Sequence, residues 1–146
     1  MRDYRRVAGL CSLLLAAPFA AAYAADEPAP AALTCSFEKG NSWSYDKGAY
    51  KSVAPSTLTF EINDIDLDKQ SAVLVTDEKQ IGALRVVRAL NANSFLEVAN
   101  EGFLNLTTVY DLDAAAGSYP AVHSRHFGIL GQPIFAQYAG SCKAKS

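Results

Sequence analysis

FLNLTTVYDLDAAAGSYPAVHSRHFGI, residues Phe103 to Ile129 of this 146-residue chain, contains the clearest pattern in the sequence and both of its histidines. The stretch predicts two β-strands, Phe103 to Asp111 and Tyr119 to Phe127, because apolar or β-branched side chains alternate with polar ones in each. Small and polar residues between them predict a loop. This hairpin indicates an all-β fold and sets the pattern for reading the rest of the chain.

Short β-rich segments of the same kind continue on both sides, and we find no segment with the period of an amphipathic helix. Leu58, Phe60 and Ile62 alternate with polar residues, which is typical of a strand with one buried face. The other expected strands are Leu33 to Glu38, Trp43 to Lys51, Thr57 to Asn63, Ser71 to Thr76, Ala83 to Leu90, Ser94 to Ala99 and Ile134 to Tyr138. Expected turns include Glu38 to Asn41, Asn91 to Asn93 and Asn100 to Gly102. Short strands with short links favour a meander over a βαβ fold.

Eight or nine such strands can form a closed barrel or a sandwich of two sheets. Cys35 and Cys142 lie near the two ends of the β region, and the first and last strands of a barrel are neighbours. A disulfide between them would join the strands where the barrel closes, and closure also removes exposed sheet edges. We therefore predict an eight-stranded, lipocalin-like up-and-down barrel, with a two-layer β-sandwich as the alternative.

The first 24 residues have the three parts of a secretory signal peptide. These are a positive head, an apolar stretch and a small-x-small site, formed by Arg2, Arg5 and Arg6, by Val7 to Phe19 and by Ala22 to Ala24. The apolar stretch is shorter than the roughly 20 residues that a spanning helix needs, and Pro18 interrupts it. We expect cleavage after Ala24, a periplasmic or secreted location, and no stable membrane anchor.

Cleavage would leave 122 of the 146 residues, which is enough for one domain and too few for two. We expect a flexible leader over residues 25–32 and a single β domain over residues 33–146. Three arginines and one aspartate leave with the signal, so 10 basic residues face 14 acidic ones and the net charge is −4. A mildly acidic chain without a basic run excludes nucleic acid as an expected partner.

The cluster His123, Ser124, Arg125 and His126 lies on the second strand of the opening hairpin. In a regular strand His123 and Arg125 share a face with Tyr119, whereas Ser124 and His126 point the other way. The two histidines therefore do not converge on a metal, and no nucleophile-elbow motif surrounds Ser124. We predict no catalytic residue, no metal site and no cofactor.

The face that carries Tyr119, His123 and Arg125 has the larger apolar side chains, so we predict that it lines the barrel. A buried guanidinium without a partner is too costly to persist. Arg125 is therefore expected to donate to a protein acceptor or to meet an anionic ligand. These three residues are our candidate ligand-binding residues, and an internal polar network is the alternative interpretation.

The run Asp64, Asp66 and Asp68 has the spacing that opens a calcium loop. The sixth position of such a loop is Lys69 here where a glycine is required, and the twelfth is Val75 where a glutamate is required. The run is therefore interpreted as a solvated turn.

NLTTV, YPAVHSRH, GQP, QY and a closing GSC together resemble a family of small secreted proteobacterial proteins, a resemblance that implies export but no activity. A broader likeness to periplasmic β-barrel lysozyme inhibitors rests on size, export, strands and a disulfide. The glycine- and serine-rich inhibitory loop of those inhibitors is not found in this sequence.

These observations predict a non-catalytic envelope protein, a small binding barrel for an unknown small molecule. The alternative is a protein-interaction or inhibitor module whose partner is an envelope protein. An enzyme is the third possibility.

Overall fold

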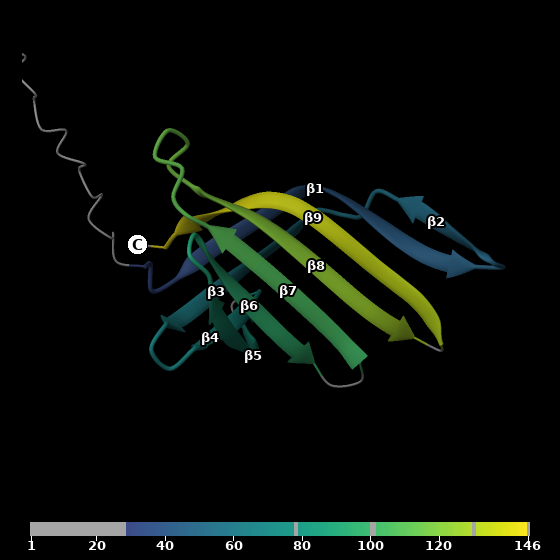
Figure 1. The fold of residues 1–146 in the computed structure, drawn as a ribbon, viewed down its shortest axis with the longest axis horizontal. Coiled ribbons are helices and arrows are strands. Elements are labelled where there is room, and N and C mark those ends of the chain that lie inside the picture. The colour runs from purple at the N-terminus through teal and green to yellow at the C-terminus, as the bar shows by residue number, and fades with distance from the viewer. Residues whose placement is uncertain (1–28, 78, 100–101, 130, 146) are drawn as a thin grey trace, which may run out of the picture.

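The structure is a computed structural model that describes residues 29–77, 79–99, 102–129 and 131–145, so the expected signal peptide lies outside the described residues. The strands are β1 (Leu33–Asp46), β2 (Ala49–Val53), β3 (Leu58–Asp66), β4 (Ser71–Thr76), β5 (Lys79–Arg88), β6 (Ala92–Ala99), β7 (Phe103–Tyr110), β8 (Tyr119–Ile129) and β9 (Gln132–Ala144). Each strand pairs antiparallel with its neighbours (Figure 1). In the described part of the chain no helix is long and apolar enough to cross a membrane.

The sheet closes into a barrel. Strand order runs β2, β1, β3 and on to β9 in sequence, and a further pairing of β1 with β9 completes a ring of eight strands. β2 pairs with the far half of β1, and in Figure 1 this hairpin lies on the side opposite the C-terminus. The predicted eight-stranded barrel is confirmed, and the sandwich alternative is wrong because the sheet has no break between its first and last barrel strands.

A disulfide bond joins Cys35 to Cys142 at the β1–β9 seam, as the sequence predicted. The two residues are direct partners in the β1–β9 register, and both are fully buried. The bond therefore connects residues 107 positions apart in the sequence where the barrel closes. It is compatible with an oxidising compartment.

Two of the expected strand boundaries near the N-terminus are wrong. The turn predicted at Glu38 to Asn41 does not form; β1 continues through it with a bulge between Phe37 and Lys39. Gly40 lets β1 come close to β9 there, since a Cβ on it would lie 2.5 Å from the Gln137 carbonyl oxygen. The segment Trp43 to Lys51 is not one strand, because Lys47 and Gly48 turn the chain with φ of 50° and 86°.

Large rings fill the middle of the barrel. The Phe37 ring lies 5.6 Å from the Phe60 ring and 6.5 Å from the Tyr138 ring, and His123 contacts all three. This layer separates the barrel into two ends. The terminal end lies beside residues 29–32 and the links β3–β4, β5–β6 and β7–β8, and the hairpin end lies beside the links β4–β5, β6–β7 and β8–β9.

Candidate functional site

The three candidate residues of β8 all face the barrel interior, at three different levels. His123 is 6% exposed, whereas its neighbour Val122 is 40% exposed and faces outward. Tyr119 lies level with Cys142, at the terminal end, and Arg125 lies toward the hairpin end. The predicted inward face is confirmed, but the barrel does not gather Tyr119, His123 and Arg125 into one site.

His123 belongs to the filled middle layer. Its Nδ1 shares a 2.8 Å hydrogen bond with the hydroxyl of Thr107, the cross-strand partner on β7. Burial, and after it the positive charge of Arg125, lowers the pKa of the His123 imidazole from 6.5 to about 4. The ring is therefore neutral at neutral pH and acts as a packed core side chain with one satisfied polar contact.

Arg125 lies between this layer and the hairpin end of the barrel. Its Cζ is 5.5 Å from the centre of the Phe127 ring, a cation–π contact. We expected a hydrogen bond from the guanidinium to a protein acceptor, but none is recorded among the described residues, and Arg125 Nε is buried without a partner there. The polar network predicted around Arg125 is therefore not found among the described residues; the hydrogen bond beside it is a single one, in which Asn105 Nδ2 donates to Glu97 Oε2 at 2.6 Å.

A hollow of about 590 Å³ opens at the terminal end, between the barrel core and the surrounding links. Inward side chains of four strands line its floor, namely Leu33, Phe95, Val109 and Tyr119. Apolar side chains at the end of β3 and in the links line its sides, among them Ile65, Leu67, Leu90 and Leu112, and Arg88, Asn93 and Asp111 add polar groups. The exposed lining of the hollow is therefore about equally polar and apolar, with charged groups of both signs at its margin.

Hydrogen bonds hold the wall of this hollow in place. Asp113 Oδ1 accepts from the backbone N–H groups of Ala115 and Ala116 at 3.0 and 3.1 Å, which fixes the β7–β8 link. On the opposite side the backbone N–H groups of Ile65 and Lys145 donate to the carbonyl oxygens of Ala31 and Ala32. The last residues of the expected leader thus contact the barrel at this end.

Of the residues that line the hollow, the sequence singled out only Tyr119. Leu90 was visible as an apolar residue at a predicted strand end, and it is fully exposed at the margin of the hollow. Leu112 was part of the alternating pattern that continues from β7. An apolar side chain next to a turn is a sequence signal for a binding surface. The sequence alone does not show which loops lie together around the hollow.

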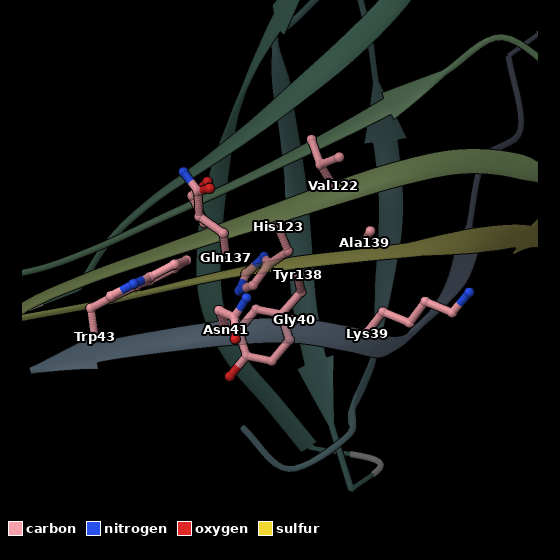
Figure 2. A pocket seen from close by; sticks show the side chains of 10 residues that line it. Lys39, Gly40, Asn41, Trp43, Val122, His123, Gln137, Tyr138 and Ala139 are labelled. Carbon is pink, nitrogen blue, oxygen red and sulfur yellow. The ribbon is translucent and has the colours of Figure 1, made fainter. Parts of the chain in front are cut away.

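A second hollow, of about 610 Å³, lies on the outer surface over β1, β8 and β9. Figure 2 shows Gln137 and Val122 on one side of these strands, with the His123 and Tyr138 rings on the other. The Trp43 ring at its edge stacks on Phe135, with the ring centres 4.9 Å apart. This hollow is a shallow depression of the sheet surface, and it is more open than the one at the terminal end.

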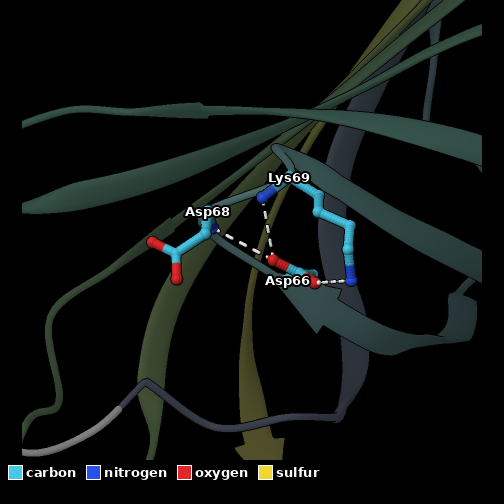
Figure 3. Close-up of polar contacts among 3 residues, drawn as sticks. All are labelled: Asp66, Asp68 and Lys69. Carbon is cyan, nitrogen blue, oxygen red and sulfur yellow. Dashed lines mark hydrogen bonds and ion pairs between the residues drawn. The ribbon is translucent and has the colours of Figure 1, made fainter.

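The Asp66 carboxylate accepts hydrogen bonds from residues of its own turn (Figure 3). Its Oδ1 accepts from the backbone N–H groups of Asp68 and Lys69 at 3.1 and 2.8 Å, and its Oδ2 accepts from Lys69 Nζ at 2.7 Å. The Lys69 side chain, and after it the Lys69 backbone N–H, lowers the pKa of the Asp66 carboxyl. Among the described residues no three His, Cys, Asp or Glu side chains are placed to hold a metal ion.

Comparison of the chain with models of known protein families and with curated proteins found no match.

Proposed function

We propose that this protein is a non-catalytic binding barrel that holds a small amphipathic molecule in the hollow at its terminal end. The observation that carries the proposal is the preformed hollow of about 590 Å³, with the fully exposed Leu90 at its margin. Covering an exposed apolar side chain with a ligand removes it from water, which lowers the free energy. The aromatic rings that fill the middle of the barrel support a site at this end and not in the core.

The lining indicates what kind of molecule would fit. Leu67, Leu90 and Phe95 offer apolar contact, whereas Arg88 and Asp111 at the margin offer one charge of each sign. Ligand sites of this volume usually combine an apolar wall with a few polar groups that orient the ligand. The proposed ligand is therefore a small amphipathic molecule with an apolar body and a polar end directed outward.

The non-catalytic part of the proposal rests on the polar side chains of the barrel. His123 is neutral and is packed between three other rings, which leaves it without access to a substrate. Ser124 and His126 lie on the outer face, apart from His123. The Thr107 hydroxyl does lie next to the His123 imidazole, but both side chains are buried, at 5% and 6% exposed, which argues against their use as a nucleophile and its base.

Export to the periplasm or beyond is part of the same proposal. The N-terminal pattern of a charged head, an apolar stretch and Ala22 to Ala24 supports it. The Cys35–Cys142 disulfide supports an oxidising compartment. Mass spectrometry of the protein from its native host should find a mature chain that begins at Ala25.

A fluorescence titration with the apolar probe N-phenyl-1-naphthylamine tests the proposed ligand site. Replacing Leu90 and Leu112 together by Asp should weaken probe binding about tenfold or more, because both apolar contacts at the margin are lost. The matched control replaces Val87 and Val98 by Asp; both are exposed, and they lie on the outer faces of β5 and β6. Equal probe affinity in the two double variants would rule out the hollow as the binding site.

One surface favours the alternative of an interaction or inhibitor module. Ile81, Val98, Leu104 and Leu106 expose apolar side chains on the outer faces of β5, β6 and β7. Exposed apolar patches often mark protein contacts. Specific retention of one envelope protein by the immobilised wild-type barrel, lost on Val98→Asp and Leu104→Asp, would favour this function. A deletion strain more sensitive to lysozyme would identify an inhibitor.

A further inference from the structure

The hairpin end of the barrel contains three polar side chains that the proposed function does not use. Glu97 on β6, Asn105 on β7 and Arg125 on β8 are cross-strand partners in one continuous row, Glu97 with Asn105 and Asn105 with Arg125. Side chains in one row of an antiparallel sheet share a face, and this row faces inward together with His123. The three side chains are partly buried.

The two opposite charges in this row are not paired with each other. The ion pairs of the described residues include none between Glu97 and Arg125. Their backbones are two strand spacings apart, or about 10 Å. Glu97 instead accepts from Asn105 Nδ2, and Arg125 lies against the Phe127 ring. A carboxylate and a guanidinium therefore lie on the two sides of Asn105 on the same inward face.

Two polar atoms in the same row lack a hydrogen-bond partner among the described residues. They are Arg125 Nε, a donor, and Asn105 Oδ1, an acceptor, and both are buried. A buried polar atom without a partner costs about 1 to 3 kcal/mol, so native proteins seldom leave one unexplained. One donor and one acceptor on neighbouring strands require a partner that can accept at one point and donate at another.

The residues on both sides of the row of Glu97, Asn105 and Arg125 are small, and two aromatic rings lie between the row and the hairpin end. Gly82 on β5 leaves room for the Glu97 carboxylate, since a Cβ on Gly82 would lie 2.8 Å from Glu97 Oε1. Ala136 on β9 is the cross-strand partner of Arg125 on the other side. Phe103 and Phe127, with ring centres 5.4 Å apart, lie one level nearer to the hairpin end and offer an apolar surface.

We propose that this row binds a small amino-carboxylate zwitterion with an apolar side chain. Its carboxylate would accept from Arg125, whose guanidinium suits that group. Its ammonium group would donate to Glu97 and to Asn105 Oδ1, and its side chain would lie against Phe103 and Phe127. Such a ligand gives each unpaired atom the partner that it lacks. The site is at the end of the barrel opposite the terminal hollow. Its test is therefore independent of the test of the proposed function.

Three related probes test the proposal, namely phenylalanine, phenethylamine without the carboxylate, and 3-phenylpropionate without the ammonium group. The readout is a ¹H–¹⁵N NMR titration that follows the Arg125 Nε–H and Asn105 Nδ2 resonances of the full protein. Phenylalanine should shift both resonances saturably. Each analogue should bind about tenfold or more weakly, because each loses one charge-assisted set of hydrogen bonds.

Two substitutions should separate the roles of the two charged residues. Arg125→Gln should weaken phenylalanine and 3-phenylpropionate but leave phenethylamine unchanged, and Glu97→Gln should weaken phenylalanine and phenethylamine but leave 3-phenylpropionate unchanged. Gly82→Ala displaces the Glu97 carboxylate without touching the backbone and should resemble Glu97→Gln. The control Arg85→Gln removes a positive charge from the outer face of β5 and should change nothing.

Three outcomes would overturn the proposal. Equal responses to the three probes would show non-specific contact, and the absence of a saturable shift at the solubility limit of phenylalanine would show that water satisfies the two atoms. An analogue that binds as tightly as phenylalanine would show a site for a single charge. Because folding of each variant is visible in the same spectra, a loss of binding in an unfolded variant is recognised and Gly82→Ala then decides.

Discussion

At the scale of single residues, His123 shows how position in the barrel determines chemistry. Histidine suggests catalysis or metal binding when it is seen beside serine and arginine in a sequence. Here strand alternation points it into a layer of three aromatic rings, where Thr107 provides its polar partner. Burial then keeps it neutral, and its role is to pack the middle of the barrel.

The lowered pKa of His123 predicts a loss of stability in mild acid. The unfolded chain binds a proton on this residue near pH 6.5 and the folded chain only near pH 4, so the stability present above pH 6.5 falls as the pH drops between these values. The loss should reach up to about 3 kcal/mol in the free energy of unfolding. Urea unfolding from pH 7.5 to 4 measures it. His123→Gln should flatten the profile over this range, and an unchanged slope would contradict the prediction.

At the scale of elements, the β1–β9 seam depends on two glycines that let the strands and their side chains come close. Gly40 faces the Gln137 carbonyl oxygen, and Gly140 faces the Ser36 carbonyl oxygen and the Cα of Phe37. In both positions a Cβ would meet backbone atoms, which cannot rotate away as a side chain can. The long β1 strand, with its bulge after Phe37, is therefore shaped by its contact with β9.

Gly140→Ala is predicted to destabilise the fold by about 3 kcal/mol or more, because overpacking against backbone forces the two strands apart. Gly128→Ala is the matched control on β8: nothing lies within 4 Å of its added Cβ. Thermal unfolding of both variants measures the difference. Similar melting temperatures for the two variants would show that the seam can widen without cost.

At the scale of the whole molecule, closure produces a barrel with a filled middle and two chemically different ends. The terminal end is a hollow lined by loops and by inward strand side chains, and the hairpin end carries the charged row of Glu97, Asn105 and Arg125. The disulfide holds the ring together at the one seam that joins the first strand to the last. The terminal hollow depends on this closure because segments distant in sequence line it, whereas the charged row lies on the consecutive strands β6, β7 and β8.

Removal of the disulfide should cost about 4 to 5 kcal/mol in the free energy of unfolding. The chain-entropy model assigns this to a closed loop of about 100 residues, and the separation here is 107. Guanidinium unfolding of the oxidised protein against Cys35→Ala/Cys142→Ala measures it, and reduction of the wild type provides an independent comparison. If the midpoint is the same in all three samples, the β1–β9 pairing is stable without the bond.

The sequence by itself determined the all-β class, most of the strands, the pairing of Cys35 with Cys142 and the inward face of β8. These follow from local alternation and turn chemistry, and the disulfide follows from the presence of only two cysteines after the expected signal. The continuation of β1 through Gly40 escaped prediction because its reason, the Gln137 carbonyl, lies on β9.

Only the tertiary structure decided between barrel and sandwich, which loops surround the terminal hollow, and that Glu97 and Asn105 stand beside Arg125. The first two depend on contacts between segments distant in the chain, and the third depends on the registers of β6 with β7 and of β7 with β8. Register is a property of a pair of strands, so it depends on turn geometry and cross-strand contacts as well as on the alternation within each strand.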